Sequence, residues 1–135
     1  MPEPVGVLID TSVLIAIERG ELDLDTVVAD PQEPLALSAV TAHELLRGVA
    51  RLPAGVRRAR SERWLETLLS AVPVIEYDLD VARVHAALWA EMSASGTSLG
   101  EHDQMIAATA ISLGYDLLTR DAAFDAVPDL ALRRW

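Results

Sequence analysis

Residues 100–124 read GEHDQMIAATAISLGYDLLTRDAAF, and this stretch decides the class of fold. The segment 101–113 has little polar face, which predicts a buried helix, and Gly114 is a residue type that commonly ends helices. Asp116–Thr119 then predicts a short strand. A buried helix that runs directly into a strand is typical of a sheet covered by helices.

The rest of the chain alternates in the same way between strand-like and helix-like segments. Such alternation predicts a parallel sheet that is covered on both faces. The other expected strands are Val5–Ile9, Pro34–Leu37, Val74–Ile75 and Leu130–Arg133, and the other expected helices are 11–19, 24–29, 38–52, 56–71 and 78–92.

The helix expected at 38–52 has the clearest pattern. Its apolar residues recur at the spacing of one helix face, which predicts a single stripe turned towards the core. The residues of this stripe are Ala42, Leu45, Leu46 and Val49.

Length and composition predict one soluble, cytoplasmic domain. With 135 residues, of which 51% are apolar, the chain has material for one core, whereas two cores would each be small. The absence of cysteine excludes disulfides, zinc–thiolate sites and cysteine nucleophiles. The N-terminus lacks the basic region of a signal peptide, and no stretch approaches the ~18 apolar residues of a membrane helix.

The charge is acidic overall and basic in one segment. The formal net charge is −10, and all 11 basic residues are arginines, which excludes mechanisms that need a lysine, such as a Schiff base or a P-loop. Residues 43–66 hold six arginines against three glutamates, a local charge of +3 on a remainder of −13. We call this segment the basic strip. It attracts a phosphate backbone, or it is a solvated helix face with Arg–Glu pairs, and both interpretations stay open here.

Two aspartates follow predicted strands. Asp10 comes directly after the first strand, and Asp121 comes two residues after the strand 116–119. The carboxyl ends of parallel strands share one edge of a sheet, where ligands bind, so both side chains are expected there. The structural alternatives are a helix N-cap for Asp10 and, for Asp121, a cap of the turn at 122–124 or an ion pair with Arg120.

Glu44 lies on the helix 38–52, away from its apolar stripe. The structural alternative is a surface ion pair with Arg47, three residues further on. Gly48 costs roughly 1 kcal/mol against alanine in the middle of a helix, which indicates that another group approaches this face closely.

Asp103 lies in the first turn of the helix 101–113. A carboxylate there interacts favourably with the helix dipole, which is a structural reason for it. Ala107 and Ala110 continue the same face and are expected to pack closely on the sheet, so a carboxylate on that face requires a partner.

The four acids together indicate a chemistry that none of them indicates alone. Two charges 4 Å apart repel by about 4 kcal/mol at an effective dielectric of 20, so clustered carboxylates must hold protons or a cation. Ligands that are all oxygens suit Mg²⁺ or Mn²⁺. Such an ion activates water for in-line attack on a phosphodiester, which makes the chain a candidate phosphodiesterase.

Other interpretations fit the sequence less well. His43 and His102 each adjoin one of the acids, but the zincin pattern HExxH is absent. A phosphatase similar to the haloacid dehalogenases would need DxDxT, and residues 10–12 read DTS. Another Mg²⁺-dependent phosphoesterase and a non-catalytic protein-binding module are the alternative functions. His85 and the three tryptophans, Trp64, Trp89 and Trp135, are expected to pack in the core or a dimer interface rather than to stack on bases.

Three blocks of the sequence resemble a known family. They are LIDTSVLIAI at 8–17, SAVTAHELLRGV at 38–49 and the stretch 100–124. They resemble the signature blocks of PIN-domain nucleases, most closely the VapC-type toxins of type II toxin–antitoxin modules, over almost the whole chain. The resemblance implies a three-layer α/β/α fold with a mainly parallel sheet of four to five strands, in a single PIN domain over residues 1–135. It further implies a Mg²⁺-dependent endoribonuclease with Mn²⁺ as a substitute, a homodimer, and a cognate VapB-type antitoxin whose arginine enters the acidic pocket.

The resemblance also assigns site residues. Its four acidic positions, both metal-ligating and catalytic, match Asp10, Glu44, Asp103 and Asp121, and Asp125 or Glu101 are the alternatives for the fourth. It implies that the hydroxyl of Ser12 or Thr119 orients a water at the metal. In the basic strip, the expected RNA-binding residues are Arg47, Arg51, Arg57 and Arg58.

Overall fold

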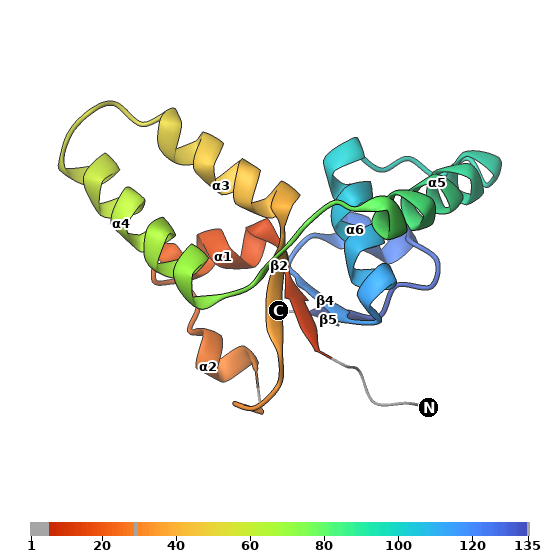
Figure 1. Cartoon of the computed structure of the whole chain (residues 1–135), viewed down its shortest axis with the longest axis horizontal. Coiled ribbons are helices and arrows are strands. Elements are labelled where there is room, and N and C mark those ends of the chain that lie inside the picture. The colour runs from red at the N-terminus through yellow and green to blue at the C-terminus, as the bar shows by residue number, and fades with distance from the viewer. Residues whose placement is uncertain (1–5, 29, 135) are drawn as a thin grey trace.

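The computed structural model describes residues 6–28 and 30–134, which form a sheet between two layers of helices (Figure 1). In these residues the sheet has five strands in the order β3-β2-β1-β4-β5, and every neighbouring pair is parallel. The predicted parallel sheet is therefore confirmed. The strands are β1 (Val7–Ile9), β2 (Leu35–Ser38), β3 (Val74–Ile75), β4 (Asp116–Thr119) and β5 (Leu132–Arg134).

Helices cover both faces of the sheet. In Figure 1, α1, α3 and α4 lie on one side, and α5 and α6 lie on the other. No helix in the described ranges is long and apolar enough to cross a membrane. The helices are α1 (Thr11–Glu18), α2 (Leu24–Val27), α3 (Ala39–Ala50), α4 (Val56–Ala71), α5 (Leu79–Ala94) and α6 (Glu101–Leu113), followed by the 3₁₀ helix η1 (Ala122–Ala126). Val5, residue 29 and Trp135, which the sequence-based predictions included, lie outside the described residues.

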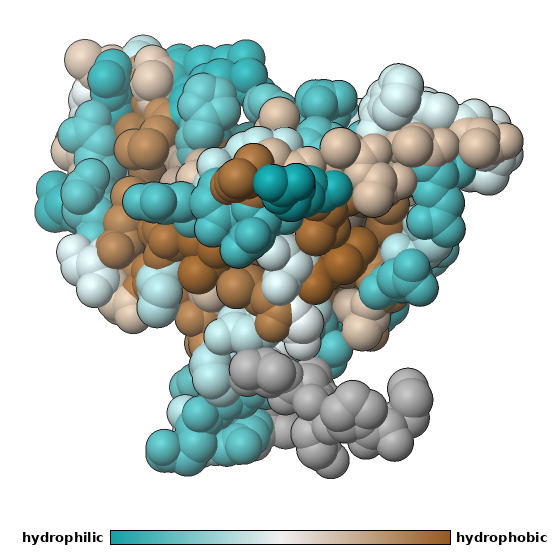
Figure 2. Space-filling model, turned by 45° about the vertical axis from the view of Figure 1, so that its right-hand side comes forward, coloured by the Kyte–Doolittle hydropathy of each residue, from teal (hydrophilic) through white to brown (hydrophobic). Residues whose placement is uncertain are grey.

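Alternate residues of the central strands enter two different cores. Val7 and Ile9 of β1 pack with residues of α1, α3 and α4, whereas Leu8 packs with residues of α5 and α6. Leu118 and Leu117 of β4 divide in the same way. Strands that are apolar on both faces require cover on both faces, which gives the three-layer α/β/α arrangement. Some apolar surface remains visible over the middle of the molecule (Figure 2).

Local chemistry sets the helix ends near the site. The Ser38 hydroxyl accepts a hydrogen bond from the Thr41 N–H at 3.0 Å and caps α3. The Asp78 side chain caps α5 in the same way, so this helix begins at Leu79. It ends at Ala94, two residues beyond its predicted end. Gly114 ends α6 with a φ of 69°, in the left-handed region that favours glycine.

The predicted stripe of α3 is wrong at one position. Ala42 and Leu45 are buried, but Leu46 is 46% exposed. Each residue of a helix turns by 100°, so Leu46 lies about 40° beyond Ala42 on the side away from the core. Thr41, on the opposite side of Ala42, is fully buried instead. The core-facing side of α3 is therefore rotated from Leu46 towards Thr41.

Candidate active site

Asp10 lies between β1 and α1, at the carboxyl edge of the sheet. It is 4% exposed, and its Oδ2 accepts hydrogen bonds from Ser12 Oγ and Thr119 Oγ1, each at 2.8 Å. Asp10 occupies the N-cap position of α1, but its side chain makes no capping hydrogen bond. Two hydroxyls, rather than the helix end, therefore orient this carboxylate.

Burial raises the pKa of Asp10 above its ordinary value, and the charge of Glu44 adds to the rise. The hydroxyls of Ser12 and Thr119 act in the opposite direction, because they donate to the charged form. Two hydrogen bonds therefore stabilise the buried charge of Asp10, which forms no ion pair with an arginine among the described residues.

Glu44 lies in the second turn of α3, with a quarter of its side chain exposed (24%). Its Oε1 accepts a hydrogen bond from Thr11 Oγ1 at 2.8 Å, and this hydroxyl lies 3.2 Å from Thr41 Oγ1. The alternative ion pair with Arg47 is not formed. Thr11 was not singled out from the sequence, although its position directly after Asp10 was a signal for a role at this edge.

Asp103 lies in the first turn of α6, and Ala107 and Ala110 below it are fully buried, as predicted. Its pKa is raised from 3.8 to about 6. Burial is the largest cause, and the charges of the three other predicted site acids follow, partly opposed by His102. The charges of Asp10, Glu44 and Asp121 therefore all act on Asp103, so the four acids interact electrostatically.

Asp121 follows β4 and is exposed. Its Oδ1 accepts a hydrogen bond from the Ala123 N–H at 2.9 Å, so it caps η1 as the structural alternative foresaw. Its own N–H donates to Thr119 Oγ1 at 2.9 Å, the same hydroxyl that holds the buried aspartate. The alternative ion pair with Arg120 is not formed, because Arg120 contacts Glu21 at 3.3 Å.

The two alternatives for the fourth acidic position are engaged elsewhere. Asp125 forms an ion pair with Arg134. Glu101 lies 3.5 Å from the Nε2 of His85. Neither charge is among those that raise the pKa of Asp103. These contacts favour Asp121 over both.

The four acids fit a divalent cation by their chemistry. Within residues 6–28 and 30–134, no three His, Asp or Glu side chains are grouped tightly enough to hold an ion as they stand. The acids nevertheless offer only oxygens, repel one another and have no arginine partner among the described ion pairs. Mg²⁺ keeps several of its waters in proteins, so it does not require a closed cage of side chains.

A groove of about 480 Å³ begins at Glu44 and runs between α1, α3 and α4. Gly48 lines this groove, and a Cβ added at this glycine would meet nothing within 4 Å. The sequence indicated that another group approaches Gly48 closely, and no group of the described residues does so. Sequence reasoning did not predict the groove. The other lining residues are Ile15, Glu18, Arg19, Leu45, Val49, Leu52, Arg57, Arg60, Ser61 and Trp64.

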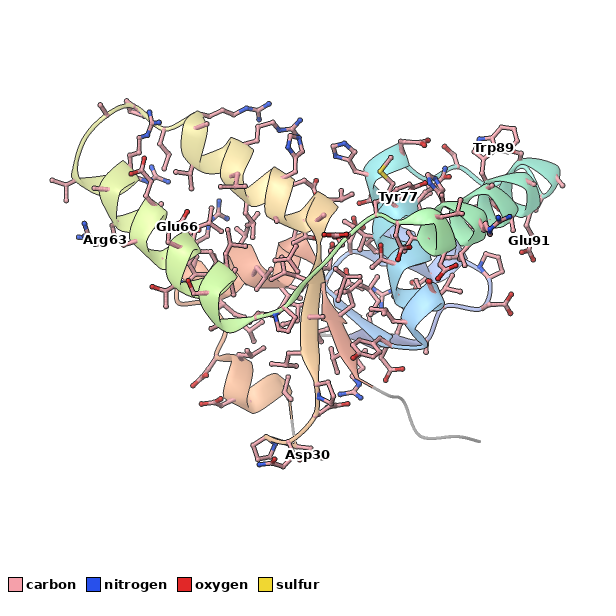
Figure 3. The ribbon with its side chains drawn as sticks, in the orientation of Figure 1. Asp30, Arg63, Glu66, Tyr77, Trp89 and Glu91 are labelled. Atoms are coloured by element: carbon pink, nitrogen blue, oxygen red, sulfur yellow. The ribbon has the colours of Figure 1, made fainter. Side chains whose placement is uncertain are left out.

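The arginines of the basic strip divide between the groove and the outer surface. Arg57 and Arg60 line the groove. Arg58 pairs with Glu62 at 2.9 Å, one turn further along α4. Arg63 points outwards from α4 (Figure 3). The Arg–Glu pairing expected of a solvated face is therefore formed by Arg58, whereas attraction of a phosphate backbone by Arg57 and Arg60 stays a prediction.

His43 and His102 flank the acids without joining them in a metal site. The centroids of the two rings lie 5.9 Å apart at an interplanar angle of 84°. The Nδ1 of His102 lies 3.9 Å from Glu44 Oε2, which is beyond hydrogen-bond length. His85, by contrast, is buried between Tyr77 and Gln104 and hydrogen-bonded to both, which confirms its predicted packing role.

Known proteins are similar to this chain in sequence and in fold over most of their length. The PIN domain pattern matches residues 7–130. The chain is 38% identical over 123 residues to the VapC ribonuclease Y4jK of Sinorhizobium fredii, covering 87% of this chain and 88% of that protein. It superposes on the solved VapBC-5 complex of Mycobacterium tuberculosis with a TM-score of 0.80 at 30% identity, covering 98% of this chain and 100% of that one. DNA-bound VapBC of Salmonella typhimurium has the same fold, with a TM-score of 0.85 at 24% identity, covering 97% and 98%.

The fold, the matched sequence pattern and the named relatives together define a nuclease domain of the PIN class. The chain belongs to the PIN-domain family, and within it to the VapC type.

Proposed function

We propose that this chain is a Mg²⁺-dependent endoribonuclease, with Mn²⁺ as a substitute, that hydrolyses RNA phosphodiester bonds at Asp10, Glu44, Asp103 and Asp121. One observation carries the proposal: burial and the charges of the other three acids raise the pKa of Asp103 to about 6. Acids that repel one another at the ligand-binding edge of a parallel sheet are stabilised by a divalent cation. We further propose that the 135 residues form one PIN domain.

Each carboxylate has its own role in this proposal. A bound divalent ion supplies a Lewis acid that neutralises phosphate charge and polarises water. Asp10, buried and held by two hydroxyls, is the rigid ligand. Glu44 and Asp121 reach the same edge from α3 and from the end of β4. Asp103, whose pKa is raised to about 6 by burial and by the other three charges, is a ligand whose charged form the ion would stabilise.

Ser12 and Thr119 are assigned to positioning Asp10 rather than to orienting water. Both hydroxyl protons are donated to Asp10 Oδ2. The oxygen of Thr119 also accepts from the Asp121 N–H, so one side chain couples two of the four acids. Loss of this hydroxyl would release both carboxylates from their present orientation.

RNA is the proposed substrate because of the relatives and the adjoining groove. One relative is the VapC ribonuclease of Sinorhizobium fredii, and another, 29% identical over 102 residues, is the tRNA(fMet)-specific endonuclease VapC of Salmonella typhimurium. Arg57 and Arg60 give the groove beside Glu44 a cationic wall that attracts a phosphate backbone, despite the net charge of −10. An RNA substrate places the activity in the cytoplasm.

The proposed partner is a VapB-type antitoxin, which makes this chain the toxin of a VapBC-type module. Solved VapBC complexes of Rickettsia felis and Salmonella typhimurium share the fold. The groove is lined by apolar residues such as Leu45 and Trp64 and by two acidic residues, Glu18 and Glu44. An amphipathic antitoxin segment with an arginine would fill both parts at once.

A homodimer is proposed through the outer face of α5. Leu79 and Trp89 are 65% and 56% exposed, and Tyr77 is 41% exposed. Trp89 points away from the body of the molecule (Figure 3). Tyr77 and Trp89 line the same surface hollow, and exposed large apolar side chains of this kind are typical of an interaction surface. Trp89→Asp is expected to shift the mass measured by light scattering from dimer to monomer.

Total RNA incubated with the purified chain tests the enzymatic proposal. Mg²⁺ should give discrete cleavage products, EDTA should abolish them, and mapping of the cut ends should identify the target. Heat released on titration with Mg²⁺ should show stoichiometric binding that Asp10→Ala and Asp103→Ala both lose. Equal cleavage by these two variants would contradict the assigned site, and intact RNA under all conditions would favour a non-catalytic binding module.

A further inference from the structure

His43 and His102 face each other beside the acids from two different helices. His43 precedes Glu44 on α3, and His102 precedes Asp103 on α6. The first turns of these helices lie above the carboxyl edge of the sheet (Figure 1). Neighbouring residues on a helix point about 100° apart, so the two imidazoles lie next to the carboxylates rather than among them.

Packing and hydrogen bonding do not account for this pair. His43 is exposed, and 42% of the His102 side chain is exposed. Among the described residues, His85 is the histidine whose ring forms hydrogen bonds, whereas the rings of His43 and His102 form none. The two rings instead lie at 84° to each other with centroids 5.9 Å apart. This arrangement forms an aromatic corner that solvent reaches.

We propose that His43 and His102 form a stacking site for one unpaired nucleobase next to the scissile phosphate. Exposed aromatic rings bind RNA bases by stacking, and a base lying flat on one ring of the corner meets the other ring as a wall. A base within a duplex has both faces covered by its neighbours, so the base held in this corner is unpaired. The inference rests on the proposed ribonuclease function and adds a base-binding subsite to it.

The test uses a fluorescent single-stranded oligoribonucleotide that spans a mapped cut site. A matched oligomer carries a ribose without a base on each side of the cut. His43→Ala and His102→Ala should each raise KM and Kd for the intact oligomer by about 5- to 100-fold, the range for one lost stack, with kcat nearly unchanged. Neither variant should alter binding of the abasic oligomer. His43→Phe and His102→Phe keep an aromatic face and should bind the intact oligomer like the parent chain.

The outcomes separate the stacking site from the nuclease proposal. Kd is measured by fluorescence anisotropy in Ca²⁺, which takes oxygen ligands in a looser geometry than Mg²⁺, so this readout does not depend on cleavage. Alanine variants that bind both oligomers like the parent, or phenylalanine variants as weak as the alanine ones, overturn the stacking site. Base-dependent binding through these rings, together with cleavage that Asp10→Ala and Asp103→Ala leave unchanged, supports the stacking site and contradicts the proposed nuclease site. A parent chain that binds neither oligomer overturns both.

Discussion

At the amino edge of the sheet, Asp116 and Glu33 are neutralised by Arg133, whereas at the carboxyl edge Asp10 and Asp103 have no arginine partner among the ion pairs of residues 6–28 and 30–134. The Arg133 Nε donates to Asp116 Oδ2 at 2.8 Å, and its Nη1 donates to Glu33 Oε2 at 2.9 Å. The carboxyl edge holds its buried carboxylate with uncharged hydroxyl donors. The same residue types therefore meet opposite electrostatic surroundings at the two edges.

The pKa values show what this difference means. The hydrogen bond with Glu33 is the largest of the effects that raise the pKa of Arg133, so this pairing stabilises the charged forms in the fold. At the other edge, burial and neighbouring charges raise the pKa of Asp103 to about 6, so its charged form is disfavoured. Paired acids stabilise the protein, whereas the unpaired ones cost stability that a cation can recover.

Removing one charge at the carboxyl edge should have the largest effect. Asp103→Asn keeps the shape of the side chain but loses the charge, and we expect cleavage to fall by roughly 1,000-fold, since a metal's Lewis acidity is worth several kcal/mol. Initial rates on a mapped RNA substrate measure the loss, and circular dichroism checks the fold. Asp125→Asn, an acid already paired with Arg134, is the matched control and should keep near-parent activity. Equal losses in both variants would contradict the assignment.

Breaking the amino edge should act on stability and leave catalysis alone. Arg133→Ala leaves two partly buried carboxylates without a partner, and the free energy of unfolding should fall by about 2–3 kcal/mol. Urea unfolding measures this change, and the cleavage rate per folded molecule should stay the same. Arg58→Ala removes an exposed pair with Glu62 and should cost no more than about 0.5 kcal/mol. A large drop in kcat for Arg133→Ala would show that the two edges are coupled.

The pH dependence of stability should expose the cost at the carboxyl edge. Below about pH 4 Asp103 is protonated in both states, and between pH 4 and about 6 the folded state keeps a proton that the unfolded state releases. Stability of the metal-free protein should therefore fall as the pH rises through this window. The full shift corresponds to roughly 3 kcal/mol, which solvent screening of this partly exposed group reduces to about 1–2 kcal/mol.

Thermal unfolding of the parent chain and Asp103→Asn in EDTA, between pH 4 and pH 7, measures this contribution. The variant should lack the Asp103 part of the fall and be the more stable protein at pH 7. Mg²⁺ should stabilise the parent and reverse the order. Stability curves that stay parallel over the whole range would argue against a strained carboxylate at this position.

The smallest expected effect concerns the groove beside the acidic edge. Arg57→Ala removes one phosphate contact, so RNA affinity should fall a few-fold and the slope of log K against log salt should become shallower by about 0.7. Anisotropy titrations at several salt concentrations measure both quantities. Arg63→Ala, on the outward side of the same helix (Figure 3), should change neither. An identical response of the two variants would mean that bulk charge, rather than the groove, attracts RNA.

Much of the fold could be predicted because its causes are local. The bounds of α4 and α6 agree with the predicted helices, since Gly55 and Gly114 flank their apolar patterns. The rotation of α3 could not be predicted, because Leu46 and Thr41 lie on opposite sides of Ala42 and only neighbouring elements decide which of the two is buried. The hydroxyl of Thr11 on Glu44 joins residues 33 positions apart, for which no local pattern exists.

By itself the sequence determined the order of strands and helices and the acids that follow β1 and β4, because backbone preferences and apolar spacing act over a few residues. The tertiary structure decided which carboxylates pair with an arginine: Arg133 reaches Glu33 across 100 positions, while Asp103 comes under the charge of Asp10 and pairs with no arginine in the described part of the chain. The physical reason is that charge interactions and desolvation depend on distance and burial in space, and neither quantity exists until the two helical layers close on the sheet.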